Sequence, residues 1–396
     1  MDNRRLTLLT NFIPPYKVPL FEQLGASFAQ FRVLISTEME PNREWKARWG
    51  RIDVVRQKSW MFRQPWKHPK GFEDSVYVHI PYDTLPQLSH SRPDLVISGE
   101  LGLRTVFARI YRLFNPRSRL IIWATLSESS EQGRGRLRNL LRRWLLRGAD
   151  GFIVNGQSGE RYLRSVAPIR VPVFHVPYTC DTRLFEPVAE RREAPAALAS
   201  RLVYVGRLIP LKGLALFLPV LRRWAQEHPK RSLEFTLIGD GSMRQEIEQG
   251  VYPPNLKVIC KGAVPYEQVA EAYAKADFSV FPTLADEWGL VVNESLACGV
   301  PMLGSLYSQA VEELILDGNN GWHFVPDDLE ASYRALDKAL SSSQETRQRM
   351  TQAARQSVAN LTVPQVAARV VAAANAVLSG ESTAGVGRSP SARRLG

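Results

Sequence analysis

The sequence predicts an α/β protein made of two doubly wound, Rossmann-like domains. Short apolar runs alternate with longer helical patterns along most of the chain, which is typical of βαβ units and parallel sheets. The chain has 396 residues, too many for one ordinary core and suited to two domains. The alternation also restarts at residues 201–206, after a segment at 187–200 that has the composition of a linker.

The first half contains six short apolar runs of the kind that form β-strands. They lie near 5–11, 30–37, 94–99, 119–125, 151–155 and 172–178. Helical patterns fall between them, notably near 17–28, 101–114, 134–147 and 157–166. Residues 40–80 are irregular in pattern and rich in Trp, Arg and Lys, which predicts long loops.

The second half repeats this organisation from residue 201 onward. After the first strand, further strands are predicted near 233–238, 256–260, 277–282, 300–304 and 321–325, and helices near 329–341, 344–359 and 363–378. We therefore divide the chain into an N-terminal domain (1–190), a C-terminal domain (191–362) and a last helix (363–378) expected to return to the N-terminal domain. The tail at 379–396 is rich in Ser, Gly, Arg and Pro, which predicts disorder.

Composition excludes several classes of protein. No run of 18 uncharged apolar residues is present, so no membrane-spanning helix is predicted. The first ten residues have the pattern of a β-strand and no cleavage site of a signal peptide. Three widely spaced cysteines (Cys180, Cys260 and Cys298) form neither a disulfide framework nor a metal site. We expect a reduced, cytoplasmic protein.

The net charge of +12 is concentrated in the first half. Residues 1–190 contain 29 Lys and Arg against 18 Asp and Glu, whereas residues 191–396 contain 22 against 21. Such asymmetry attracts phosphate-rich partners, either nucleic acid or the anionic face of a membrane.

The most informative segment is 286–301, which follows an apolar strand and continues into a predicted helix. Asp286 and Glu294 have seven residues between them, and Glu287 follows Asp286 directly. Open α/β sheets bind ligands just beyond their strand ends, where these acids are expected. This segment resembles the E-x7-E signature of the retaining GT-B glycosyltransferases of the family 4 type. In that family the first acid is usually Glu, so either Asp286 or Glu287 takes its place here.

A second element supports the resemblance. The strand that ends at Gly206 is followed by Arg207, Lys212 and a helix start near Gly213, and this is similar to the family's G-R-x4-K-G element. A guanidinium fork, an ammonium group and a helix N-terminus together suit a diphosphate. The resemblance implies that Arg207 and Lys212 hold the diphosphate of a nucleotide-sugar. The alternative is a pair of solvated surface charges.

Further donor contacts are implied by the resemblance. Gly239 and Gly241 lie in a glycine loop after a strand, and Val264 lies in the segment 260–265, which is similar to the one whose backbone reads the nucleobase. Gly289 and Leu290 begin the helix that carries Glu294. In the family the second acid, here Glu294, holds the ribose hydroxyls, and the first lies nearer the sugar. Trp288 fits packing better than sugar stacking.

The first half carries the resemblance only in pattern. Tyr16, Lys17, Glu100 and Glu128 follow predicted strands, where an acceptor would bind, but each also fits an ordinary turn or helix start. Asn155, Gly156 and Asp181 match the family's closing segments of this domain loosely.

The helix near 134–147 has two interpretations. Its apolar residues fall on one face and its arginines cover most of the rest: Leu137, Leu140, Leu141, Trp144 and Leu145 against Arg136, Arg138, Arg142, Arg143 and Arg147. It is either docked on the sheet by its apolar face or in contact with anionic lipid. The segment 60–70, with interfacial aromatics beside cations, supports the second.

The function predicted first is a retaining glycosyltransferase that moves a hexosyl group from a nucleotide-sugar to a saccharide or polyprenyl-linked saccharide. This would serve cell-surface or exopolysaccharide synthesis, with peripheral contact at the cytoplasmic membrane face. No metal and no other cofactor is expected. A nucleotide-sugar epimerase or hydrolase of the same fold is the alternative. A nucleic-acid-binding protein would explain the basic half, but not the acidic pair.

Overall fold

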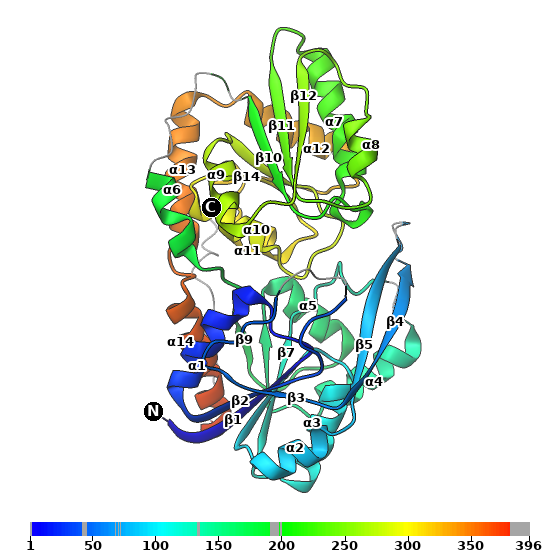
Figure 1. Cartoon of the computed structure of the whole chain (residues 1–396), viewed down its shortest axis with the longest axis vertical. Helices are drawn as coiled ribbons and strands as arrows, with labels where there is room; N and C mark the ends of the chain where they lie inside the picture. The colour runs from blue at the N-terminus through cyan, green and yellow to red at the C-terminus, as the bar shows by residue number, and fades with distance from the viewer. Residues whose placement is uncertain are drawn as a thin grey trace. The chain divides into compact units, whose positions relative to one another are not determined.

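The computed structural model describes residues 2–41, 46–67, 69, 71, 73–132, 135–190, 198 and 200–380. The chain folds into two compact units, one formed by Met1–Thr179 with Val363–Gly396 and the other by Cys180–Thr362 (Figure 1). Most of the predicted tail at 379–396 lies outside the described residues, as does much of the predicted linker at 187–200.

The first unit is built on a seven-stranded parallel sheet with the order β3-β2-β1-β6-β7-β8-β9. Its strands are β1 (Asp2–Thr10), β2 (Phe28–Ile35), β3 (Asp53–Arg56), β6 (Leu95–Gly99), β7 (Arg119–Ala124), β8 (Gly151–Val154) and β9 (Val173–His175). Its helices include α1 (Val18–Ser27), α2 (Thr84–Ser91), α3 (Leu103–Phe114), α4 (Arg136–Leu146) and α5 (Gln157–Val166), with a 3-10 turn η1 (Pro15–Lys17). Strand β8 is buried along its whole length, as expected for a parallel strand covered on both faces.

Helix α14 (Val363–Ser379), the last of the described helices, packs in the first unit. It contacts α1, β7 and β8, and Val366, Val370 and Val377 lie in the same core as the first strands. A Cβ added to Gly151 would lie 2.7 Å from Cγ2 of Val377, so β8 and α14 approach closely. The chain therefore completes the first core with residues from its far end.

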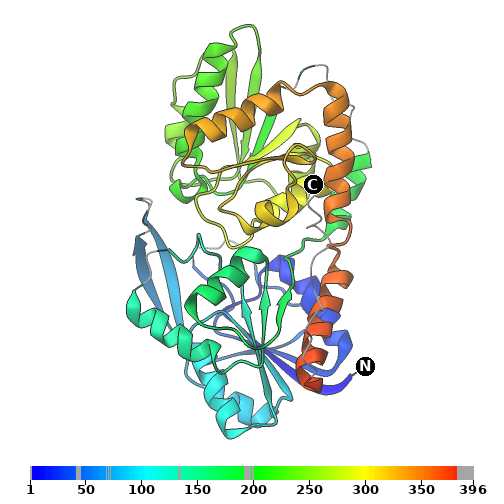
Figure 2. The same ribbon diagram turned by 180° about the vertical axis from the view of Figure 1, so that it is seen from behind.

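One prediction for the first unit is wrong. Residues 40–80 contain β3 and a two-stranded antiparallel hairpin of β4 (Ser59–Lys67) and β5 (Glu73–Pro81), where long loops were expected (Figure 2). The hairpin carries exposed aromatic and charged residues without strict alternation, because it does not cover a core with one face. Its pattern consequently lacks the period-2 signal of a half-buried strand.

The second unit has a six-stranded parallel sheet with the order β12-β11-β10-β13-β14-β15. Its strands are β10 (Arg201–Val205), β11 (Leu233–Ile238), β12 (Leu256–Gly262), β13 (Phe278–Phe281), β14 (Met302–Ser305) and β15 (Gly321–Phe324). Its helices include α7 (Leu214–Glu227), α8 (Arg244–Glu248), α9 (Tyr266–Ala274), α10 (Leu290–Ala297), α11 (Gln309–Leu314), α12 (Leu329–Leu340) and α13 (Gln344–Val358), with a 3-10 turn η3 (Pro210–Lys212). The predicted fold class of two doubly wound α/β domains is confirmed.

The boundary between the units lies at residue 179 rather than at 190. The 3-10 turn η2 (Thr182–Leu184) and helix α6 (Glu186–Glu190) belong to the second unit, where α6 contacts α9. The ring of Phe185, which is fully buried, meets that of Tyr266 at 5.7 Å between centroids. Residues 180–190 therefore pack with the second unit. The polar composition of the segment did not indicate this packing.

In the described ranges, no single helix is long and apolar enough to cross a bilayer; only α13 and α14 taken together across a break pass that test.

Candidate functional site

The strand order of the second unit reverses beside β10, between β10 and β13. The chain runs from β10 outward to β11 and β12, and then returns to β13 on the other side of β10. Loops that follow the two strands of such a reversal diverge and leave a crevice for ligands. The loop at 206–213 follows β10 and the loop at 282–289 follows β13, so the predicted site residues of both loops border this point.

An ion pair joins these two loops. Lys212 Nζ donates to Oδ2 of Asp286, and the two side chains are 15% and 19% exposed, so the pair is shielded yet open to a ligand. Asp286 is held in place by its backbone, whose N–H donates to the carbonyl of Tyr307 at 3.1 Å. Its Oδ1 accepts from the N–H of Trp288 at 3.3 Å. Cation and carboxylate therefore stand together at the reversal point.

Glu287, the other candidate for the first acid, lies differently. It is exposed, and its backbone carbonyl accepts a hydrogen bond from Nε2 of Gln309 at 2.5 Å. The carboxylate that the fold brings to Lys212 is that of Asp286.

Glycines allow the loops after β10, β11 and β13 to approach one another. A Cβ on Gly239 would lie 2.0 Å from the carbonyl oxygen of Gly206, and one on Gly213 would lie 1.9 Å from that of Pro282. Backbone hydrogen bonds join the same loops: the N–H of Gly206 donates to the carbonyl of Ile238 at 2.9 Å, and the N–H of Leu284 donates to that of Leu211 at 2.9 Å. The atoms that an added Cβ would meet belong to the backbone, which cannot move aside as the end of a flexible side chain can. These positions therefore require glycine. A Cβ added to the half-buried Gly241 would lie 2.4 Å from the carbonyl oxygen of Leu208.

Arg207 lies next to the end of β10 and is half-buried. The phenol of Tyr204, inside the sheet, donates to the Arg207 carbonyl at 2.7 Å. Burial raises the pKa of Tyr204; the charge of Asp286 raises it further, and the charge of Arg207 lowers it. Both charges thus act on one phenol, which places Arg207 and Asp286 around the same strand end. Val264, half-buried, lies in the loop after β12.

Glu294 is a buried carboxylate on α10, the helix that begins after Gly289. Leu290, half-buried, is its first residue, so Glu294 lies in the second turn of the helix. A preference of acids for the first turn therefore does not explain it. Tyr266 and Tyr273 donate to its two oxygens at 2.9 and 3.5 Å. Burial raises the pKa of Glu294 to about 7, against the hydrogen bonds of both tyrosines.

Sequence reasoning missed Tyr266 and Tyr273. They are seven residues apart in α9, two turns of one helix face, and this spacing was the available signal. Trp288, in contrast, packs as expected: it is 1% exposed, and its Nε1 donates to Oδ1 of Asn293 at 2.8 Å. Gly289 has φ of 102° and would place a Cβ 2.6 Å from the Phe281 ring.

The candidate residues of the first unit form a separate set. Lys17 Nζ donates to the Tyr178 phenol at 2.9 Å and lies 5.6 Å from the Trp123 ring. Glu128 accepts from Arg161 Nε at 2.8 Å and from Ser158 at 3.3 Å.

Two other candidates of the first unit lie at strand ends. Glu100 has φ of 68°, a left-handed conformation that is strained for a residue with a side chain. Asn155, at the end of β8, is buried and donates to the Thr125 carbonyl at 3.4 Å. Asp181 falls in the second unit, where it caps η2 and pairs with Arg183. None of these contacts tests an acceptor role, which stays a prediction for each of these residues.

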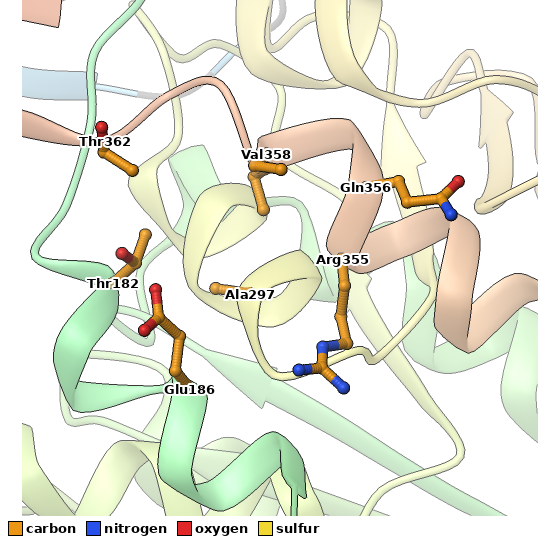
Figure 3. A pocket seen from close by; sticks show the side chains of 8 residues that line it. Thr182, Glu186, Ala297, Arg355, Gln356, Val358 and Thr362 are labelled. Carbon is orange, nitrogen blue, oxygen red and sulfur yellow. The ribbon is translucent and has the colours of Figure 1, made fainter. Parts of the chain in front are cut away.

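A pocket of about 350 Å³ lies elsewhere in the second unit, between η2, α6 and α13 (Figure 3). None of the predicted donor residues lines it. Its lining residues are Thr182, Glu186, Ala297, Arg355, Gln356, Val358, Ala359 and Thr362. Across the part of the chain that the structure describes, no group of three or more His, Cys, Asp or Glu could hold a metal ion.

The second unit is similar to known proteins. Residues 192–357 match the family described as Glycosyl transferases group 1. Sulfoquinovosyl transferase SQD2 of Arabidopsis thaliana is 27% identical over 157 residues, which is 39% of this chain and 29% of that protein. The glycogen synthase of Mycobacterium tuberculosis (strain ATCC 25618 / H37Rv) is 28% identical over 220 residues, 54% of this chain and 50% of that protein. The chain thus spans half or less of either relative.

The fold is shared along nearly the whole chain. The crystal structure of Anabaena Alr3699/HepE in complex with UDP aligns with 94% of this chain and 100% of that one, with a TM-score of 0.68 and 16% identity. The resemblance to GT-B glycosyltransferases, predicted from the segments at 206–213 and 286–301, is confirmed by these matches.

Proposed function

We propose that this chain, whose residues 192–357 match the group 1 glycosyl transferases, is a retaining glycosyltransferase of the family 4 type acting in the cytoplasm. It would move a hexosyl group from a nucleotide-diphosphate-sugar to a saccharide or polyprenyl-linked saccharide, in cell-surface or exopolysaccharide synthesis. One observation carries the proposal: Lys212 and Asp286 meet at the strand reversal, beside the helix that bears the buried Glu294. The UDP bound to a protein of the same fold supports a nucleotide donor.

The proposed donor site assigns each group a task. Arg207, Lys212 and the N-terminus of α7 would hold the diphosphate, because cations and free helix N–H groups stabilise phosphate oxygens. Their positive charge would stabilise the leaving diphosphate without a metal ion. Glu294 would accept hydrogen bonds from the ribose hydroxyls. The loop containing Val264 would contact the base.

Asp286 would change partner when the donor binds. In the free protein it pairs with Lys212, and a diphosphate would compete for that ammonium group. The carboxylate would then hydrogen-bond sugar hydroxyls and stabilise the positive charge that develops at the anomeric carbon. In the retaining reaction the bond from that carbon to the phosphate oxygen breaks as the acceptor oxygen bonds on the same face. The departing phosphate accepts the acceptor's proton.

A nucleotide panel tests the donor site. We expect one of UDP, GDP and ADP, or its sugars, to raise the melting temperature, since a ligand at 100 times its Kd stabilises the fold by about 2.7 kcal/mol. The double variant Arg207→Ala/Lys212→Ala should lose this shift. No shift with any nucleotide would contradict the proposal. Donor breakdown that proceeds equally without any acceptor would replace it with a hydrolase or epimerase.

The raised pKa of Glu294 predicts that donor binding depends on pH. The carboxyl group is neutral below about pH 7 and ionised above it, and ribose hydroxyls bond best to the ionised form. Donor affinity should therefore rise with pH, by roughly tenfold between about pH 6 and pH 8. Calorimetry with an intact nucleotide-sugar measures this, because its diphosphate diester does not titrate in the range.

Two variants check the assignment to Glu294. Glu294→Gln should bind weakly and show no pH dependence, because the amide does not titrate. Tyr266→Phe should move the midpoint upward, because that hydroxyl holds the pKa of Glu294 down. A wild-type affinity that does not change between these pH values would contradict a role for the carboxylate.

A further inference from the structure

Helix α4 of the first unit exposes the side that carries its large apolar residues. Leu137, Leu140, Leu141 and Trp144 recur at the spacing of one helix face. They are 81%, 64%, 37% and 37% exposed. Of the five apolar residues that sequence analysis offered as a docking face, only Leu145 is buried. Docking of α4 by its apolar stripe is therefore wrong.

The helix is attached through a different side. Leu145 and Leu146, near the end of the helix, are buried. Arg142, one turn earlier, is buried as well, with 1% of its surface exposed. Its guanidinium lies 2.5 Å from Oε2 of Glu131 and donates to the Tyr162 phenol. A surface helix ordinarily buries its apolar stripe and exposes its charges. In α4 the arginine that pairs with Glu131 is buried in the protein, and three leucines are exposed. This orientation suits a helix whose apolar face contacts an apolar medium outside the protein.

Positive charge borders the apolar stripe. Arg138 and Arg143 of α4 and Arg147, the residue after it, are exposed, and the segment 132–149 contains no acidic residue. The guanidinium of Arg109, from α3, lies 3.8 Å over the Trp144 ring. An apolar face flanked by arginines is the composition of helices that lie in a membrane interface.

The β4–β5 hairpin extends this surface. Trp60, Met61 and Phe62 are 60%, 41% and 54% exposed, and Lys58 and Arg63 beside them are exposed too. Successive side chains of a strand point to opposite faces, so both faces of the hairpin are apolar at this point. Helix α3 contacts both β5 and α4, and both views draw hairpin and helix on the same flank of the first unit (Figures 1 and 2).

We propose that the α4–hairpin surface, formed by Leu137, Leu140, Leu141, Trp144 and Trp60–Phe62 with their flanking arginines, binds an anionic lipid bilayer. Acyl chains match the exposed leucines, Trp and Phe, and headgroup phosphates match the arginines. Nucleic acid would use the arginines but leave the apolar stripe in water. The inference is independent of the proposed transferase activity, because binding to vesicles needs neither donor nor acceptor.

Co-sedimentation of the full chain with vesicles tests the proposal. We expect binding to mixed phosphatidylcholine–phosphatidylglycerol vesicles in dilute salt and much weaker binding to pure phosphatidylcholine. Leu137→Ser/Leu140→Ser should reduce partition at least tenfold on anionic vesicles. Arg138→Gln/Arg147→Gln should reduce it about fivefold for each arginine, and only on anionic vesicles.

A matched control comes from the second unit. Leu316 is 50% exposed and Arg334 is exposed, so Leu316→Ser/Arg334→Gln removes the same groups elsewhere and should bind like wild type. Because all substituted side chains are exposed, unchanged melting temperatures should verify folding. Absence of wild-type binding, undiminished binding by the leucine variant, or binding to RNA in place of vesicles would each overturn the proposal.

Discussion

Replacing Lys212 with alanine is expected to reduce kcat/KM for sugar transfer by about 10²–10³-fold, the usual cost of removing one preorganised group that stabilises charge. The variant loses the ammonium group proposed to hold the diphosphate. It also leaves the Asp286 carboxylate, 19% exposed, without its cation, so that a negative charge faces the incoming phosphates. Steady-state kinetics and nucleotide affinity, measured together, record both effects.

Asp286→Asn should separate the two effects. It removes a carboxylate that competes for Lys212, so nucleotide affinity should be kept or improved while transfer falls, because sugar contacts are lost. Glu287→Gln, one residue away on an exposed side chain, should change neither. Lys230→Ala removes an exposed lysine in the same unit and should match wild type. If Lys212→Ala bound the nucleotide as tightly as the wild type, the proposal that Lys212 holds the diphosphate would be contradicted.

The largest effect on stability is expected for Gly213→Ala. Gly213 has φ of 75°, and a Cβ there would lie 1.9 Å from the carbonyl oxygen of Pro282. The left-handed conformation costs about 1–2 kcal/mol. The clash with a rigid backbone should bring the total to about 3–5 kcal/mol. Thermal and urea unfolding measure this, and a loss of roughly 10 °C in Tm is expected for a unit of this size.

Gly318 offers a control with the same backbone and no clash. Its φ is 76°, and a Cβ there would meet nothing within 4 Å. Gly318→Ala should therefore cost only the conformational part, about 1–2 kcal/mol. Equal costs at the two positions would show that the loop after β10 adjusts freely, and would contradict the argument that the close approach to Pro282 requires glycine at position 213.

Much of the fold was predictable because parallel strands covered on both faces are continuous apolar runs. The runs near 94–99, 119–125 and 233–238 correspond closely to β6, β7 and β11. The β4–β5 hairpin escaped because its exposed faces leave no alternation to read. The unit boundary escaped because the contact of Phe185 with Tyr266 depends on how α6 meets α9, and neither segment shows this alone.

The candidate site divides in the same way. The spacing of Arg207, Lys212, Asp286 and Glu294 is a property of the sequence, and it predicted loops after strands that the structure shows to be neighbours. The sequence left the choice between Asp286 and Glu287 open, and the structure shows that Asp286 is the one paired with Lys212. The two tyrosines on Glu294 come from another helix, so only three-dimensional packing brings them there.

The sequence by itself determined the two α/β domains, the family resemblance and the order of the donor motifs, because these depend on local periodicity and spacing. Tertiary structure alone decided which side of α4 is buried. Helical periodicity shows that an apolar and a basic face exist, but not which one meets the protein. The buried pair of Arg142 with Glu131 settles that orientation, and it leaves Leu137 and Leu140 exposed. Which side of a helix is buried depends on the surface that it packs against as well as on its own sequence.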